Sequence, residues 1–184
     1  MATREEAWEL LCTHTSSERL RRHARAVEIA MRAYAERFGA DAEEWGIVGL
    51  LHDLDYERHP SAEEHPFAGE RILAEHGYPE RIRRAVLSHA DHTRVKRESN
   101  MERALYACDE LCGFLLAVAY VRPDGKIAGV EPRSVRKKMK DKAFARAVSR
   151  EELLRGAEEL GVEFDEHVRF LVAALAAHAD ELGV

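Results

Sequence analysis

The sequence predicts an all-α protein, and two observations indicate this fold class. Apolar residues recur at intervals of three and four positions along almost the whole chain, which is the period of a helix with one buried face. No segment combines strict apolar and polar alternation with the β-branched residues typical of strands. The 184 residues suit one globular domain, and no internal repeat, low-complexity tract or linker divides them.

The first three helices are predicted from the residues that begin and end them. One helix covers about residues 3–12. A longer helix follows Thr15-Ser-Ser-Glu18, a capping-box pattern in which a hydroxyl and a carboxylate bond free backbone N–H groups, and it ends near Gly39. Asp41 and a glutamate three residues on repeat the capping signature for a third helix, which ends at residue 52.

A polar break separates these helices from the next two. Residues 54–64 contain a proline and predict a loop. The next helix covers about residues 66–76 and stops before Gly77. Another helix has Pro79 in its first turn and runs to about residue 89.

The remaining segments complete the helical pattern. A long helix spans about residues 100–121, and Arg122-Pro-Asp-Gly125 forms a turn. Ser149 caps a helix that ends at Gly161, and a final helix covers about residues 165–182. The apolar face of the final helix packs on the core by default, or on another subunit, so a homodimer stays open.

Composition and charge exclude several classes of partner. A net charge of −6 and a pI near 5.9 give no overall attraction to a nucleic acid polymer or an anionic membrane. The longest apolar stretch, residues 113–121, is too short to cross a bilayer, and no signal pattern is present. Cys12, Cys108 and Cys112 are odd in number and lack Cys-x-x-Cys spacing, which favours a reducing compartment. We expect a cytoplasmic protein.

Two histidines are predicted to point inward from apolar helix faces. His23 lies three residues after Leu20 and four before Val27, and His89 lies three residues after Val86. Residues three or four apart share one face of a helix, so both imidazoles should point where these apolar side chains point.

Asp109 is a stronger constraint, because it lies on the apolar face formed by Leu105 and Cys112. An unpaired buried carboxylate is so unfavourable that it takes up a proton or finds a cation, either an arginine or a metal ion. His65 also faces inward, in the first turn of its helix on the side of Gly69.

Taken singly, each inward histidine is also explained as a hydrogen-bonded core residue. Several such histidines together with an adjacent His-Asp pair after an apolar run indicate a buried metal site instead. Imidazole and carboxylate ligands suit iron, manganese, zinc or magnesium. The candidate ligands are His23, His52, Asp53, His65, His89 and Asp109.

The order of these residues resembles the HD-domain superfamily of metal-dependent phosphohydrolases. The matching pattern is a histidine on an early helix, an adjacent His-Asp pair and an aspartate on a later long helix, here His23, His52, Asp53 and Asp109. The resemblance covers about residues 19–120. It implies a single helical-bundle domain over residues 1–184, in which the C-terminal helices of about residues 131–183 pack on this motif core.

A subgroup of the family that binds two metal ions has additional histidines. His65-Pro-Phe-Ala-Gly69 is similar to its His-Pro-x-x-Gly motif, and His89 is similar to its next histidine. The resemblance implies that one ion is held by His23, His52, Asp53 and Asp109, and a second by His65 and His89 with Asp53 bridging.

The chain departs from the family where many relatives continue the pair as His-Asp-Ile-Gly-Lys. Here the sequence is His52-Asp-Leu-Asp-Tyr56, so the lysine thought to assist phosphate chemistry is missing. Another cation must serve, or the substrate differs. The candidate catalytic residues are Asp53, Asp55 as the nearest extra carboxylate, and His92 as a substrate ligand or proton carrier, with an exposed loop histidine as the alternative.

Other side chains could contact the substrate. The basic segment 133–142 could bind phosphate groups if it folds over the pocket mouth, and otherwise it forms a solvated helix face. Tyr56, Arg58 and His59 either face the substrate or lie on a surface loop. The candidate phosphate ligands are Arg133, Arg136, Lys137 and Lys140.

The expected function is metal-dependent hydrolysis of a phosphate ester of a small nucleotide or phosphorylated metabolite, by a phosphomonoesterase or phosphodiesterase that uses a metal-activated hydroxide. Two divalent ions are expected, with manganese or iron favoured and zinc, magnesium, cobalt or nickel also compatible. Two alternatives stay open, an HD-type di-iron oxygenase and a non-catalytic regulatory module that binds metal or nucleotide. The expected partner is a small anionic phosphorylated substrate.

Overall fold

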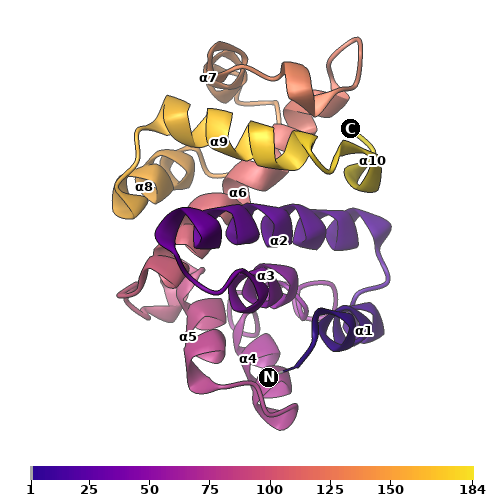
Figure 1. Ribbon diagram of the computed structural model, residues 1–184, viewed down its shortest axis with the longest axis vertical. Helices are drawn as coiled ribbons and strands as arrows, with labels where there is room; N and C mark the ends of the chain where they lie inside the picture. The colour runs from indigo at the N-terminus through magenta and orange to yellow at the C-terminus, as the bar shows by residue number, and fades with distance from the viewer. Residues whose placement is uncertain (1) are drawn as a thin grey trace. The chain divides into compact units, whose positions relative to one another are not determined.

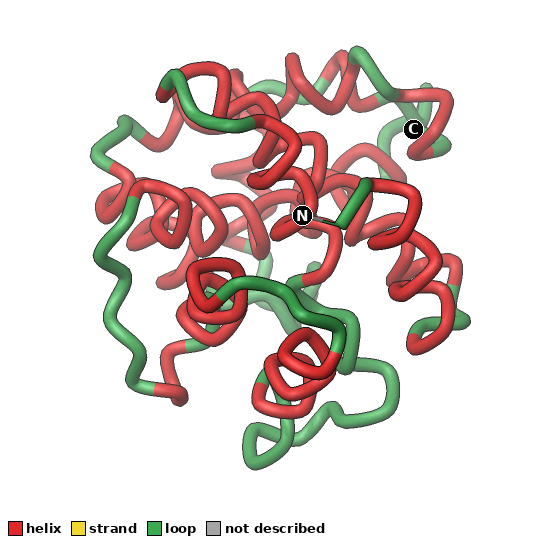
Figure 2. The backbone as a smooth tube through the Cα atoms, turned by 60° about the horizontal axis from the view of Figure 1, so that its bottom comes forward, coloured by secondary structure: helices red, strands yellow, loops and turns green. Residues whose placement is uncertain are grey.

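The computed structural model describes residues 2–184, and this part of the chain contains helices, turns and loops but no strand (Figure 1). Figure 2 shows the same backbone as helix and loop segments. The predicted all-α fold class is therefore confirmed. None of the helices in residues 2–184 has both the length and the apolar character of a bilayer-spanning segment.

The chain divides into two compact units, one ending at Tyr106 and the other beginning at Ala107. The long helix α6 (Asn100–Tyr120) begins in the first unit and ends in the second. The expectation of one domain, with the C-terminal helices packed on a single core, stays a prediction.

The helices of the first unit begin and end within two residues of their predicted bounds. A short 3-10 helix, η1, was not expected from the sequence. The elements before α6 are α1 (Arg4–His14), α2 (Glu18–Phe38), α3 (Ala42–Leu51), α4 (Phe67–Glu75), α5 (Glu80–Ser88) and η1 (Asp91–Thr93).

The predicted N-terminal cap is observed for α3 but not for α2. Asp41 accepts hydrogen bonds from the backbone N–H groups of the two glutamates that follow, as predicted, at 2.9 and 3.2 Å. The capping box predicted at Thr15 is wrong. Ser17 caps α2 by accepting from the Leu20 N–H at 3.4 Å, whereas the Thr15 hydroxyl donates to the Leu54 carbonyl at 3.2 Å. The Thr15 hydroxyl therefore bonds a residue distant in the sequence instead of capping the helix as the local pattern predicted.

The contact between α2 and α3 places two of the predicted metal ligands, His23 and His52, side by side. A Cβ atom on Gly49 would lie 2.8 Å from the Val27 carbonyl oxygen, so only glycine permits the observed approach of the two helices. Val27 is fully buried, and every residue of α3 from Trp45 to Leu51 is buried. This packing brings the rings of His23 and His52 to a centroid distance of 5.3 Å.

The second unit holds the end of α6 and the C-terminal helices. The final helix, predicted as one piece, is instead broken, because the His178 N–H bonds the Leu175 carbonyl three residues back and His178 leaves helical dihedral angles. The spacing of apolar residues in the sequence does not reveal such a tightened last turn. The elements are η2 (Ile127–Gly129), α7 (Pro132–Lys140), α8 (Arg150–Leu160), α9 (Phe164–Ala176) and α10 (Ala179–Leu182).

Within the second unit, α8 and α9 both contact α6 at Ala107. A Cβ atom on Gly156 would lie 2.8 Å from the Ala107 Cα atom, so this glycine permits a close approach of α8. His167 of α9 is fully buried, and its Nε2 donates to the Ala107 carbonyl at 3.0 Å. The sequence pattern assigned no role to His167, and the structure gives it one in packing.

A buried carboxylate joins the N-terminal helices of the first unit. Glu28 is only 5% exposed, and its oxygens accept from Nε and Nη2 of Arg4, both at 3.0 Å, and from Nε of Arg32 at 3.1 Å. Arg32 also donates to Glu43 at the start of α3. The hydrogen bond to Glu28 raises the pKa of Arg4 above its usual value. These ion pairs connect α1, α2 and α3.

Substitution of Glu28 by alanine should destabilise the first unit by about 2 kcal/mol, because charge-assisted hydrogen bonds are lost and two arginines remain without their buried partner. Trp8 and Trp45 both belong to this unit, so urea unfolding followed by tryptophan fluorescence measures its stability. Glu36→Ala, an exposed change on the same helix, should alter the free energy of unfolding by less than about 0.5 kcal/mol. Equal stabilities of the two variants would contradict the expectation.

Candidate metal centre

His52 and Asp53 lie directly after the last residue of α3. His52 is fully buried, and its Nδ1 donates to the Gly49 carbonyl at 2.8 Å. Because that carbonyl can only accept, the other ring nitrogen, Nε2, carries the lone pair of the neutral imidazole. Nε2 lies 3.4 Å from Oδ2 of Asp53.

Two further histidines are oriented in the same way. Nδ1 of His89, at the end of α5, donates to the Val86 carbonyl at 2.5 Å. Nδ1 of His65 donates to Oδ1 of Asp55 at 2.9 Å. A ligating histidine characteristically donates its second ring N–H to a carbonyl or a carboxylate, which sets the tautomer and the ring orientation. Both imidazoles therefore present Nε2 as the available ligand atom.

Asp53 is the residue that these imidazoles share. Its Oδ2 lies 3.4 Å from Nε2 of His52 and 4.0 Å from Nε2 of His23. Its Oδ1 lies 3.3 Å from Nε2 of His65 and 3.4 Å from Nε2 of His89. Each carboxylate oxygen thus faces a different pair of ring nitrogens. Burial opposes the charge of Asp53, but when no metal ion is bound, the charge and hydrogen bonds of His52 and His89 in their protonated forms outweigh burial and lower the pKa of Asp53 well below its usual value.

The donor atoms form two groups that could hold divalent metal ions. The Asp53, His65 and His89 donors lie within 4.8 Å of one another, and so do the His23, His52 and Asp53 donors. Lone-pair nitrogens beside carboxylate oxygens repel one another unless a proton or a metal ion lies between them. Imidazole and carboxylate are also suitable ligands for first-row divalent metals. The residues present therefore fit a metal site.

Asp109, the remaining predicted ligand, is a partly buried residue of α6. It belongs to the second unit, whereas His23, His52, Asp53, His65 and His89 belong to the first. Its role as a ligand stays a prediction.

Asp55 was predicted as a catalytic carboxylate, and its contacts indicate a positioning role. It is fully buried, and its two oxygens accept from Nδ1 of His65 and from the backbone N–H of Gly69, the latter at 2.8 Å. A Cβ atom on Gly69 would lie 3.0 Å from Oδ1 of Asp55, which explains the glycine in the His65-Pro-Phe-Ala-Gly69 motif. Asp55 holds His65 in place, and direct catalysis by Asp55 stays a prediction.

His92 and Tyr56 approach the histidine cluster from loops. His92, exposed in η1, donates through Nε2 to the His65 carbonyl at 2.7 Å, so it contacts the backbone of the cluster. Its role as a proton carrier or substrate ligand stays a prediction. Tyr56 is 40% exposed, and its ring centroid lies 5.2 Å from that of His65. Arg58 and His59 instead contact Thr13 and Glu64 on the surface.

The four predicted phosphate ligands all lie on α7 and line one pocket of the second unit. Arg169 of α9 lines the same pocket, and sequence analysis missed it because nothing in the local pattern around it indicates that α9 faces α7. The predicted ligands are Arg133, Arg136, Lys137 and Lys140.

Comparison with known families identifies one match. A family model described as "HD domain" matches residues 20–114, which is just over half of the chain. No curated protein and no solved structure matches the chain. The matched range contains every histidine and aspartate predicted as a metal ligand.

Asp55→Asn should weaken metal binding by about 10- to 100-fold, because one acceptor oxygen becomes an NH₂ group that must face either His65 Nδ1–H or Gly69 N–H. Calorimetric titration of the metal-stripped protein with Mn²⁺ measures the affinity. The matched control is Glu63→Gln, since Glu63 is an exposed residue of the preceding loop. Equal Mn²⁺ affinities of the two variants would show that Asp55 does not orient a ligand.

Proposed function

Because the chain belongs to the HD-domain family, we propose that it is a metal-dependent hydrolase that cleaves a phosphate ester of a small nucleotide or phosphorylated metabolite. The observation that carries the proposal is the Asp53 carboxylate, whose two oxygens face two different pairs of imidazole nitrogens. A carboxylate with this environment can bridge two cations, the arrangement used by many two-metal phosphatases.

We assign one ion to the oxygen of Asp53 that faces His23 and His52, with Asp109 as a further ligand. The second ion is assigned to the oxygen that faces His65 and His89. Manganese or iron is favoured, and zinc, magnesium, cobalt or nickel is also compatible with mixed nitrogen and oxygen ligands. This dinuclear assignment rests on the two donor groups that share Asp53.

Two divalent ions bound there would polarise a phosphoryl oxygen and lower the pKa of a bound water for in-line attack. The protein supplies the geometry. Asp53 sets the separation of the two donor groups. Asp55 accepts a hydrogen bond from His65 and another from the Gly69 N–H, and so holds His65 in place. The imidazole ligands are neutral, so they leave the positive charge of the site available to an anionic substrate.

The surroundings of the cluster suit a small phosphorylated substrate. Tyr56 occupies the position of the family lysine and lies beside His65, partly exposed, where its ring can meet a bound molecule. His92 is exposed and contacts the His65 carbonyl, and we assign it proton transfer to the leaving group. The acidic net charge argues against a nucleic acid polymer or an anionic membrane as the partner.

The metal-stripped chain should not hydrolyse phosphate esters, and addition of Mn²⁺ or Fe²⁺ should restore turnover. A screen of nucleoside phosphates and sugar phosphates, with Mn²⁺, Fe²⁺, Co²⁺, Ni²⁺, Zn²⁺ and Mg²⁺ added separately, measures released phosphate or the dephosphorylated product. Asp53→Ala should lower both the bound metal and the rate at least about 100-fold, since it removes the ligand shared by both groups. Glu63→Gln is the control and should retain both.

Three outcomes would contradict the proposal. Full activity of the metal-stripped chain would exclude metal-dependent chemistry. Loading with Fe²⁺ without oxygen, followed by exposure to oxygen and an organic substrate, tests the oxidative alternative, and oxygen-dependent product with new optical absorption bands would favour an oxygenase. Tight nucleotide binding without turnover under any metal would instead favour a regulatory module.

A further inference from the structure

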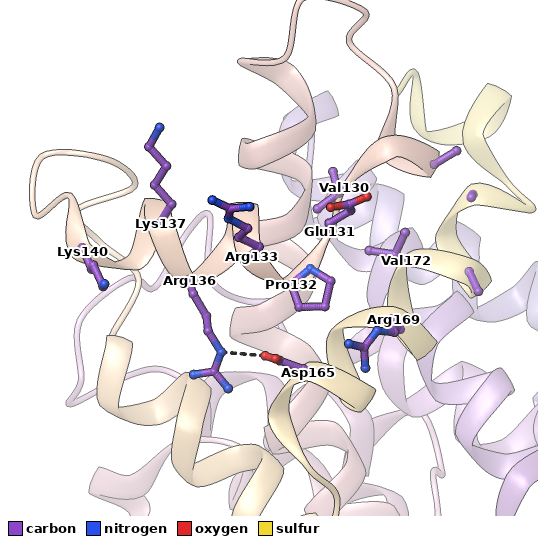
Figure 3. Close-up of a pocket in the computed structure, with 13 residues that line it drawn as sticks. Val130, Glu131, Pro132, Arg133, Arg136, Lys137, Lys140, Asp165, Arg169 and Val172 are labelled. Atoms are coloured by element: carbon purple, nitrogen blue, oxygen red, sulfur yellow. Dashed lines mark hydrogen bonds and ion pairs between the residues drawn. The ribbon is translucent and has the colours of Figure 1, made fainter.

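The second unit contains a pocket of about 860 Å³ that uses none of the histidines of the metal centre. Its walls come from α7 and α9, which contact each other, and from the segment around η2 (Figure 3). We propose that this pocket binds a phosphorylated small molecule that carries an apolar or aromatic group, the chemical class to which nucleotides belong. The inference does not depend on the hydrolytic activity of the metal centre.

The pocket is positively charged although the chain as a whole is acidic. Five arginines and lysines line it against two carboxylates, whereas the whole chain has a net charge of −6. Arg136 is engaged with Asp165 at 2.7 Å and with Glu163 at 3.6 Å. Among residues 2–184, no ion pair or hydrogen bond engages the other four cationic side chains, which are exposed. These are Arg133, Lys137, Lys140 and Arg169.

The cations come from two helices and surround one apolar surface. Four of the cations lie on α7. Arg136, Lys137 and Lys140 follow Arg133 by three, four and seven positions, so all four share one helix face. Val172, Ala173 and Ala176 of α9 follow Arg169 at the same spacings and supply apolar lining. In Figure 3, Arg133 and Arg169 lie on either side of Pro132.

The cations and the apolar lining together indicate the class of ligand. Guanidinium groups bind phosphate oxygens in a bidentate manner, and lysines add positive charge without fixed geometry. The apolar lining can cover a ring or a hydrocarbon group, which a bare inorganic anion does not possess. A volume of about 860 Å³ lies within the usual range of about 300 to 1,000 Å³ for small-molecule sites. The pocket therefore favours a compact amphiphilic phosphate over an extended acidic peptide.

The test uses the full-length chain with three probes, ADP, inorganic pyrophosphate and adenosine, in calorimetric titrations. ADP should bind at least about tenfold more tightly than pyrophosphate, because only ADP also buries a ring. Adenosine should bind weakest, because the cations then have no anion to contact. ADP should still bind after addition of EDTA and in the variant Asp53→Ala, since no lining residue belongs to the metal centre.

Charge-removing variants locate the binding. Arg133→Gln combined with Lys137→Gln should weaken ADP binding at least about tenfold. Lys142→Gln combined with Arg146→Gln removes the same two charges from exposed residues outside the pocket, so it should change the affinity less than about twofold. Arg169→Gln alone should also weaken binding, because α9 supplies the opposite wall, whereas Arg146→Gln alone should not.

Several results would overturn the inference. These are the absence of ADP binding, equal losses in the pocket and control variants, and ADP binding that disappears in both EDTA and Asp53→Ala, which would assign it to the metal centre. Equal affinities for ADP and pyrophosphate would show that the apolar lining contributes nothing and would overturn the proposed ligand class. Tighter binding of a polyglutamate peptide than of ADP would favour an acidic protein partner instead.

Discussion

The Asp53 carboxylate among four imidazoles is the interaction on which the first unit depends. A partly buried carboxylate is stable only when opposite charge or hydrogen-bond donors surround it. Here one oxygen faces Nε2 of His23 and His52 and the other faces Nε2 of His65 and His89, so a metal ion or a proton is needed between the carboxylate and these nitrogens. Residues from four helices or helix ends meet at Asp53, so the cluster forms only when α2, α3, α4 and α5 pack around it.

The orientation of the cluster comes from atoms that do not belong to it. The free carbonyls near the ends of α3 and α5, at Gly49 and Val86, accept the Nδ1 protons of His52 and His89. Helix ends leave such carbonyls without partners inside the helix, so a histidine that follows the last turn finds one within reach. His65 lies just before its helix, where the backbone groups without helical partners are N–H donors, and Asp55 supplies the acceptor instead. Helix polarity thus explains why one histidine needs a buried carboxylate behind it.

The two units offer different chemistry to an anionic molecule. The first unit presents neutral nitrogen ligands and one shared carboxylate, a set that attracts an anion only through the charge of bound metal ions. The second unit presents permanent cations beside an apolar surface, so the binding proposed there would need no metal. A chain with a net charge of −6 carries four unengaged cations at one pocket, and the proposed ligand class rests on this local excess of positive charge.

Helical spacing and capping residues determined the all-α class, most helix bounds, and the inward direction of His23 and His89, because these depend on neighbours within one or two turns. The ordered histidines and aspartates also sufficed for the family. Tertiary structure alone decided that Thr15 bonds Leu54 instead of capping α2, that Asp55 supports His65, and that Arg169 faces the cations of α7. Each of these contacts joins residues separated by a loop or by one or more entire helices. Local periodicity carries no information about which distant partner will be within reach, and packing of the whole chain selects that partner.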